Sequence, residues 1–248
     1  MIKTKKGIAV MVLTLCLFSG ASLFSGCQPR VKSDVSLITH TPCAPPCWQN
    51  ITPGVSSEDE VLTKLRSNPF VEISTIKYSM IGEIEPPLIT ISWQAPGKDY
   101  IYLQNGVIWR MEGRYNYVYL QSGKVLRIEV GLNGEITLAE IIEKYGSPES
   151  VYAQAGAADF YWYDIVFDYP VYGLRLESFS LVDPKEIKSG RIRVTEEMRI
   201  TGAYYYTPAF SLEEALHDAF LLTPDQIAKY MAYSQKWQGF VTIPIANW

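Results

Sequence analysis

The alternation of apolar and polar residues predicts β-strands in both halves of the chain. In the stretch LITISW, Ile89, Ile91 and Trp93 fall on one face of an extended strand. Three other stretches alternate in the same way. VIWRM places Val107, Trp109 and Met111 on one face, and KVLRIEV does the same with Leu126, Ile128 and Val130. RIRVTEEMRI places Ile192, Val194, Met198 and Ile200 on one face. This pattern is typical of antiparallel strands with one solvated face. Asn105-Gly106 and Ser122-Gly123 lie between apolar runs and predict hairpin turns.

Two helix starts share one pattern at a spacing of 80 residues. They lie in PCWQNITPGVSSEDEVLTKL (46–65) and LRIEVGLNGEITLAEIIEKY (126–145). Without a gap, the offset aligns Gly54 with Gly134, Ser57 with Thr137, Glu60 with Glu140, Val61 with Ile141, Leu62 with Ile142, Lys64 with Lys144, Ser67 with Ser147 and Val71 with Val151. Each Ser/Thr-x-x-Glu is a capping box, in which the hydroxyl and the carboxylate satisfy free backbone amides. Duplication explains the ungapped register, and two independent helix starts with common cap chemistry are the alternative.

These patterns predict an α+β fold of two tandem units. Each unit has a short helix that packs on an antiparallel meander of about four strands. We assign the first unit to 51–131 and the second to 132–210. A helical segment follows at 211–248, where Ser211 and Glu214 form a third box and Thr223-Pro224 opens another helix.

The N-terminal residues are typical of a secreted, lipid-anchored protein. Lys3, Lys5 and Lys6 precede an apolar run over 8–18, which is too short to span a bilayer comfortably. FSGC at 24–27 resembles the lipobox of bacterial lipoproteins, in which cleavage leaves an acylated cysteine as the first residue. We therefore expect a signal peptide at 1–26, acyl chains such as palmitate on Cys27, and a tether with a cysteine clip over 27–50. Gln28 resembles the sorting pattern for an outer membrane, so the expected location is the cell membrane or the outer membrane, facing outside the cytoplasm.

Removal of 1–26 makes the chain more acidic. Lys plus Arg falls from 22 to 19 against 26 Asp plus Glu, so the net charge changes from −4 to about −7. An acidic chain without a Lys/Arg block is not typical of nucleic-acid binding. About 220 residues remain, which is enough for one large or two small cores.

Two cysteines remain in the mature chain, in HTPCAPPCW. Outside the cytoplasm, Cys43 and Cys47 are expected to form a disulfide. The alternative is a metal or redox site that includes His40, three residues before Cys43. The two prolines between the cysteines favour a rigid clip, and we expect no metal or cofactor.

A family resemblance follows from the repeated motif. Gly-x-Ser/Thr-x-x-Glu-Val/Ile before a short helix, then YGSPESV (145–151) and a strand meander, resembles the BamE/SmpA-type envelope lipoprotein. The tandem arrangement resembles the beta-lactamase-inhibitor-protein fold and covers about 50–206. The first unit departs from the family, with Arg66-Ser67-Asn68-Pro69 where the family has Gly-x-Pro. The resemblance implies protein binding or assembly at the envelope without catalysis.

Motifs for catalysis are absent from the sequence. The chain has no GxSxG, HExxH or P-loop, and its two histidines are His40 and His217. Asp164 and Asp168 fall on one face of the strand predicted over YDIVFDY. The alternative function is therefore an envelope protein that binds or hydrolyses glycan with these two carboxyl groups.

Aromatic residues predict a protein-binding surface on the solvated face of the sheet. In DFYWYDIVFDY, Tyr161, Tyr163, Ile165 and Phe167 are expected to face the helices, and Phe160, Trp162, Asp164, Val166 and Asp168 to face solvent. In RYNYVYL, Val118 and Leu120 would point inward. The residues expected to contact a protein partner are Tyr115, Tyr117, Tyr119 and Trp162. Alternatively, these rings stack on neighbouring strands or lie under the C-terminal helices.

Overall fold

The computed structural model describes residues 34–81, 86–95, 99–104, 107–112, 116–132, 135–157, 161–182, 184–209 and 211–246. All of them belong to one unit, Ser33–Trp248. The helices are α2 (Ser36–Thr39), α3 (Glu58–Arg66), α4 (Leu138–Tyr145), α5 (Pro184–Ile187), α6 (Leu212–Asp218) and α7 (Pro224–Tyr233), with single 3-10 turns at Ile73–Thr75 and Pro170–Tyr172. None of the described helices is long and apolar enough to cross a membrane.

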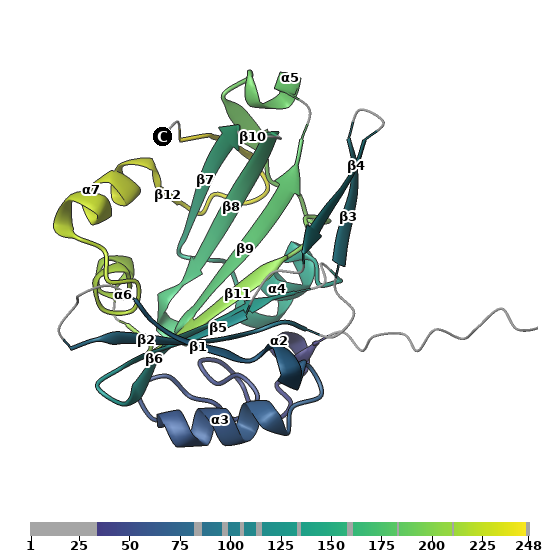
Figure 1. Ribbon diagram of the computed structural model, residues 1–248. Coiled ribbons are helices and arrows are strands. Elements are labelled where there is room, and N and C mark those ends of the chain that lie inside the picture. The colour runs from purple at the N-terminus through teal and green to yellow at the C-terminus, as the bar shows by residue number, and fades with distance from the viewer. Residues whose placement is uncertain are drawn as a thin grey trace, which may run out of the picture. The chain divides into compact units, whose positions relative to one another are not determined.

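The described strands form one large antiparallel sheet and two small ones. The large sheet has the order β1-β2-β5-β6-β11-β9-β8-β7-β12, and β3 pairs with β4 and β10 with β13. The strands are β1 (Lys77–Ile81), β2 (Leu88–Trp93), β3 (Asp99–Gln104), β4 (Val107–Glu112), β5 (Asn116–Gln121), β6 (Lys124–Gly131), β7 (Ser150–Ala157), β8 (Tyr161–Tyr169), β9 (Leu174–Leu181), β10 (Arg191–Arg193), β11 (Gly202–Tyr206), β12 (Gln235–Lys236) and β13 (Thr242–Pro244). The sheet twists strongly, since β2 and β6 run across Figure 1 whereas β7, β8 and β9 rise steeply. The predicted α+β class is confirmed.

Capping chemistry explains where the helices begin. At α3 the Ser57 amide donates to the Glu60 carboxylate at 2.9 Å, and the Glu60 amide donates back to the Ser57 hydroxyl. Thr137 and Glu140 form the same box at α4. In both pairs the hydrogen bonds from the cap residue hold the carboxylate charged and lower the pKa of the glutamate. α7 begins in the same manner, with Thr223 as its cap and Pro224 as its first residue.

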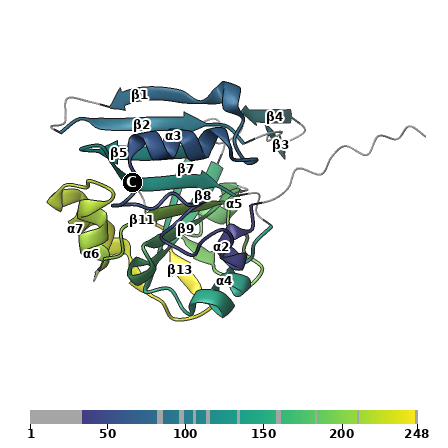
Figure 2. The same ribbon diagram turned by 90° about the horizontal axis from the view of Figure 1, so that it is seen from below.

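The main core lies between the sheet and helices α3 and α4, which cover the same face (Figure 2). The helices contribute Val61 and Leu65 from α3 and Ile141 and Tyr145 from α4. Alternate strand residues meet them, and those buried to 0% exposure are Ile91, Trp93, Val118, Leu120, Ile128, Ile165, Phe167, Leu174, Leu176 and Ala203. The inward orientation predicted for Val118 and Leu120 is confirmed.

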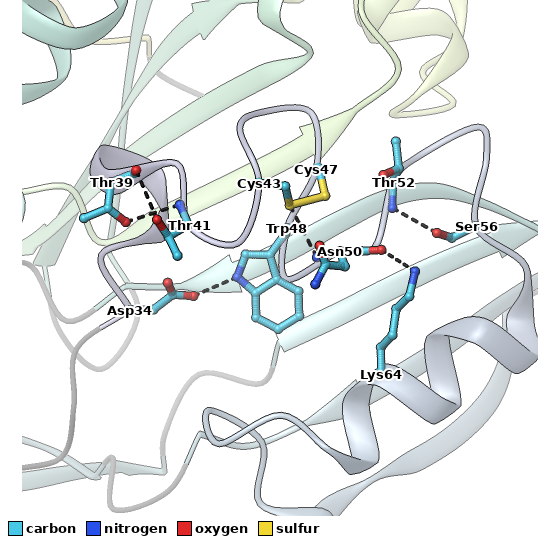
Figure 3. The surroundings of a disulfide bond; sticks show 10 residues. All are labelled: Asp34, Thr39, Thr41, Cys43, Cys47, Trp48, Asn50, Thr52, Ser56 and Lys64. Carbon is cyan, nitrogen blue, oxygen red and sulfur yellow. Dashed lines mark hydrogen bonds between the residues drawn. A yellow bond between two sulfur atoms is a disulfide. The ribbon is translucent and has the colours of Figure 1, made fainter.

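Residues 34–51 pack against this core, where the sequence predicted a tether with a cysteine clip over 27–50. Leu37, Trp48 and Ile51 are buried, and the Trp48 ring stacks on Trp93 at 5.4 Å. The Trp48 indole donates to Asp34 at 2.8 Å, and Cys43 and Cys47 are joined in a disulfide beside it (Figure 3). Among the described residues, the packing against the core therefore starts close after Asp34.

Two predicted strands differ in register or extent. In β6, Tyr119 pairs with Arg127 and Leu120 with Val125, so Leu126 is the extra residue of a β-bulge. Val125, not the predicted Leu126, faces the core, because a bulge shifts the alternation by one position. Ser122 and Gly123 both have positive φ, as the predicted hairpin turn requires. Asn105-Gly106 lies outside the described residues.

The stretch RIRVTEEMRI is not the single strand that its alternation predicts. Only Arg191–Arg193 is extended, and it pairs with β13 outside the large sheet. Further along, Arg199 bridges to the cap residue Thr137, and the Ile200 amide donates to the Ile136 carbonyl at 2.9 Å. The backbone of Arg199 and Ile200 therefore pairs with the residues at the start of α4 and does not join the large sheet. The next residues, Gly202–Tyr206, form the sheet strand β11.

We predict that removal of either cap hydroxyl weakens the fold measurably. Ser57→Ala and Thr137→Ala should each lower the free energy of unfolding in urea by about 1 kcal/mol, because each leaves a helix amide without its acceptor. Thr63→Ala is the control, because Thr63 is an exposed residue inside α3 and alanine favours the helix. An equal loss in all three variants would contradict a role for the caps.

Candidate partner-binding face

The face of the sheet opposite α3 and α4 carries mainly polar and aromatic side chains. We call it the aromatic-acidic face. Strand register assigns to it Tyr117, Tyr119, Arg127, Glu129, Trp162, Asp164, Val166, Asp168, Arg175, Glu177, Phe179, Tyr204 and Tyr206. The face divides into a part covered by α6 and α7 and a part that is half-buried (Figure 1).

An ion pair lies at the centre of the covered part. Arg175 Nε donates to Asp168 Oδ1 at 2.7 Å, and Asp168 is 0% exposed. The second carboxylate oxygen accepts from the Ser150 hydroxyl at 2.9 Å and from the Tyr230 hydroxyl of α7 at 2.8 Å. Burial opposes the charge of Arg175, but the Asp168 carboxylate together with Tyr230 and Tyr206 outweighs it and raises the pKa of Arg175. A buried charge pair with this many partners fixes α7 on the sheet.

The solvent exposure predicted for Asp168 and Val166 is therefore wrong. Both are buried, with Val166 packed against Leu212, Leu216 and Ile227 of the C-terminal helices. A pair of glycosidase carboxyl groups has to reach the substrate. Asp168 is enclosed, whereas Asp164 remains half-exposed and accepts from Gln154 Nε2 at 3.3 Å. The two carboxyl groups of the predicted pair thus lie in different environments.

Phe220, which follows α6, marks the boundary of the covered part. The Arg175 guanidinium lies 4.2 Å from the centre of the Phe220 ring, and that of Arg127 lies 5.3 Å from it. Arg127 also donates to the Ala219 carbonyl at 2.9 Å. On the far side, the guanidinium of Arg127 lies 3.8 Å from the Tyr119 ring centre. Stacked cations and rings therefore connect the helical cover to the half-buried part.

The half-buried part combines tyrosines with carboxylates. The rings of Tyr117 and Tyr119 are 5.9 Å apart, and the Tyr119 hydroxyl donates to Glu129 at 3.4 Å. The Tyr204 hydroxyl donates to Glu177 at 2.7 Å. Burial, followed by the nearby carboxylates Glu129 and Glu177, raises the pKa of Tyr119 and Tyr204, respectively. Both tyrosines are neutral and donate to these carboxylates.

Trp162 lies flat on the neighbouring strand at the far end of this face. Its indole covers Gly156, where a Cβ would come within 2.3 Å of the ring. Its other contact is Phe179 of β9, stacked at 5.9 Å. Gly156 therefore provides the space that the tryptophan occupies, and Trp162 remains half-buried.

The predicted contact residues lie on the same face of the sheet, but they are not neighbours on it. Tyr117 and Tyr119 lie on β5 and Trp162 on β8, with β6, β11 and β9 between them. Tyr115 lies outside the described residues. Tyr161, which was predicted to face the helices, is 39% exposed at the start of β8, beyond the core. The residues that fill the interval, Glu129, Tyr204 and Glu177, were missed. The alternation within β6, β11 and β9 was the available signal for Glu129, Tyr204 and Glu177, respectively.

The candidate metal ligand His40 does not join the cysteines. Its Nε2 lies 3.0 Å from the Tyr145 hydroxyl, and burial lowers its pKa, as does Lys144. Cys43 and Cys47 are oxidised to each other. Within the described residues, no group of three or more His, Cys, Asp and Glu side chains is arranged to hold a metal ion.

Comparisons with known proteins assign no family. No protein-family model, no curated protein and no solved structure matches this chain.

We predict a large stability loss when one charge of the buried pair is removed. Asp168→Ala should lower the free energy of unfolding by about 3–5 kcal/mol, because Arg175 stays buried without its counter-charge. The double variant Asp168→Leu with Arg175→Met should recover most of this loss, since it buries no charge. Asp218→Ala, an exposed carboxylate on α6, is the control and should change stability by less than about 0.5 kcal/mol. A neutral Asp168→Ala would contradict the role of the pair.

Proposed function

We propose that this chain is a lipid-anchored protein of the bacterial cell envelope that binds a protein partner through its aromatic-acidic face, without catalysis. The observation that carries the proposal is the half-buried row of Tyr117, Tyr119, Tyr204, Phe179 and Trp162 among carboxylates. Tyr and Trp are enriched at protein interfaces because they bury a large area with few rotatable bonds. The resemblance to BamE/SmpA-type lipoproteins supports the same conclusion.

The anchor is supported by the N-terminal residues and by the position of the packed domain. Lys3, Lys5 and Lys6, the apolar run over 8–18 and FSGC are the layout of a lipoprotein signal. Several acyl chains on Cys27 would hold the protein stably on a membrane, as a single chain does not. From Cys27 to Asp34 the chain reaches at most about 25 Å when fully extended. The proposed anchor therefore keeps the domain close to the membrane surface.

We further infer that residues 51–131 and 132–210 are two copies of one structural unit. α3 is followed by the sheet strands β1, β2, β5 and β6, and α4 by β7, β8, β9 and β11. In each half the helix cap bridges to the segment of the last strand, as Ser57 does to Lys124 and Thr137 to Arg199. The two last strands, β6 and β11, are neighbours in the sheet. This shared arrangement supports duplication over independent helix starts.

The chemistry of the face indicates the kind of partner surface that fits it. Burial raises the pKa of Tyr204, and the carboxylates Glu177, Glu129 and Asp164 raise it further, so three acidic side chains gather around the middle of the face. The whole mature chain is acidic as well, near −7. A partner that offers Lys or Arg beside apolar side chains would be attracted by these acidic side chains and would cover the rings.

We predict that the aromatic residues determine capture of the partner. Capture is measured by crosslinking in intact cells and identification of the product. Tyr117→Ser and Trp162→Ser should each lower the recovered partner about tenfold or more, because a large aromatic contact in a protein interface contributes on the order of 2 kcal/mol. Tyr172→Ser, which changes a 40% exposed tyrosine away from this face, is the control.

The melting temperature of each variant has to be measured beside the capture. Undiminished capture by the folded Tyr117→Ser and Trp162→Ser variants would contradict the proposal. A large loss of melting temperature in either variant would mean that its ring belongs to the core.

We predict that Cys27 carries the membrane anchor. The wild-type chain should partition into the detergent phase and show the mass of an acylated product that begins at Cys27. Cys27→Ser should leave the protein uncleaved or in the aqueous phase, and Cys43→Ser is the control. A wild-type protein that carries no acyl group and stays in the aqueous phase would exclude the anchor. It would not bear on the proposed binding face.

A further inference from the structure

Strand β1 forms one edge of the large sheet and exposes all five of its side chains. Tyr78 is 53% exposed, Met80 63% and Ile81 43%. Within the described part of the chain, β2 is the only strand that pairs with β1. The residue Ile73, shortly before β1, adds a further apolar side chain at 57% exposure. The edge therefore exposes large apolar side chains, and no further described strand pairs with it.

The opposite edge of the sheet is of a different kind. β12 has two residues, Gln235 and Lys236, which pair with Val151 and Ser150 of β7, and Gln154 further along β7 bridges to Ala246. Proteins usually protect their sheet edges in this way, with very short strands or with charges. β1 has one charged residue, Lys77, at its beginning, followed by the exposed large side chains of Tyr78, Met80 and Ile81 on either side of Ser79. An unprotected apolar edge is typical of a site that another strand covers.

We propose that β1 pairs with β1 of a second copy of this chain, in antiparallel orientation about Ser79. The two large sheets would then continue as one sheet through a two-fold axis at Ser79. This interface goes beyond the proposed partner binding and uses a different part of the molecule.

The order of residues in β1 is self-complementary about Ser79. Antiparallel pairing centred there places Tyr78 opposite Met80 of the second copy and Lys77 opposite Ile81 of the second copy. Each Met80 therefore contacts an aromatic ring, which favours a sulfur–ring contact, and no like charges meet. Centres at Tyr78 or Met80 would pair only three of the five residues. Side-chain alternation forbids registers that place residues of opposite faces together.

The two-fold symmetry of this pairing keeps the core side and the aromatic-acidic face of the two copies on matching sides of the joined sheet. An axis perpendicular to the sheet keeps each face of one copy on the same side as that of the other copy. The buried N-terminal residues Leu37 and Trp48 pack on the core side. Both N-terminal segments would therefore leave from the same side of the joined sheet. Both aromatic-acidic faces would look the other way.

Five paired residues make a small interface. Stable dimers usually bury well over 1,000 Å² in total, so we expect association that depends on concentration. If the proposed acyl anchor holds both copies in one membrane, their effective concentration rises and the same contact is occupied more often. The pairing itself does not depend on the anchor.

The first test is sedimentation equilibrium of the full chain in detergent. The mass of the wild type should rise towards twice the chain mass with increasing concentration. The double variant Tyr78→Lys with Met80→Lys should stay at the chain mass, because the like charges would face each other across the pair. Both positions are exposed, so the fold should be retained, and circular dichroism checks this. Val171→Lys with Tyr172→Lys changes two exposed apolar residues elsewhere and should associate like the wild type.

The second test identifies the occupant of the edge. Ser79 is replaced in intact cells by a benzophenone amino acid that crosslinks on illumination, and Val171 is replaced in the same way as control. A product of twice the chain mass that contains only this chain, seen at Ser79 but not at Val171, is the expected result. A product that contains a different protein at Ser79 would assign the edge to a partner strand and overturn the proposal. A wild type that stays monomeric at all concentrations and gives no product would overturn it as well.

Discussion

The pairing of β6 with β11 is the contact on which the architecture depends. It joins β1, β2, β5 and β6 to the rest of the large sheet through five residue pairs, from Gly131 with Gly202 to Arg127 with Tyr206. Ile128 pairs with Tyr205 on the core side, whereas Glu129 pairs with Tyr204 on the other side. A slip of one residue would exchange these two sides and bury a carboxylate in the main core. One register therefore fixes both the core beneath α3 and α4 and the composition of the opposite face.

Sequence patterns predicted those parts of the fold whose structure is determined by residues close together in the chain. The boxes at Ser57 and Thr137 depend on residues three positions apart, and the turn at Ser122-Gly123 on two neighbours. The inward-facing residues of β5 could be predicted from its alternation because one face of the strand is buried and the other is not. The bulge at Leu126 was not readable, because a bulge is set by the pairing with β5 and leaves no mark in the alternation of β6 alone.

The exposure of Asp168 could not be predicted from its own strand. Its partners are Arg175 on the next strand and Tyr230 on a helix 62 residues away. The sequence assigned the correct face of β8 to this aspartate, but the cover over that face comes from α6 and α7. A buried charge is tolerated only where its partners are already in place. The position of the pair is therefore a property of the assembled sheet and helices, not of any short segment.

The same network affects how rigid the rest of the aromatic-acidic face is, which matters for the proposed partner binding. Phe220 packs near both Arg127 and Arg175, so the helical cover contacts the sheet up to that ring. Beyond it, Tyr119 lies against Arg127 and Tyr117 against Tyr119, while Trp162 lies on Gly156 and Phe179. These rings are held by their neighbours before any partner arrives. Aromatic side chains that are fixed in advance lose little conformational freedom on binding, and more of the contact energy remains for affinity.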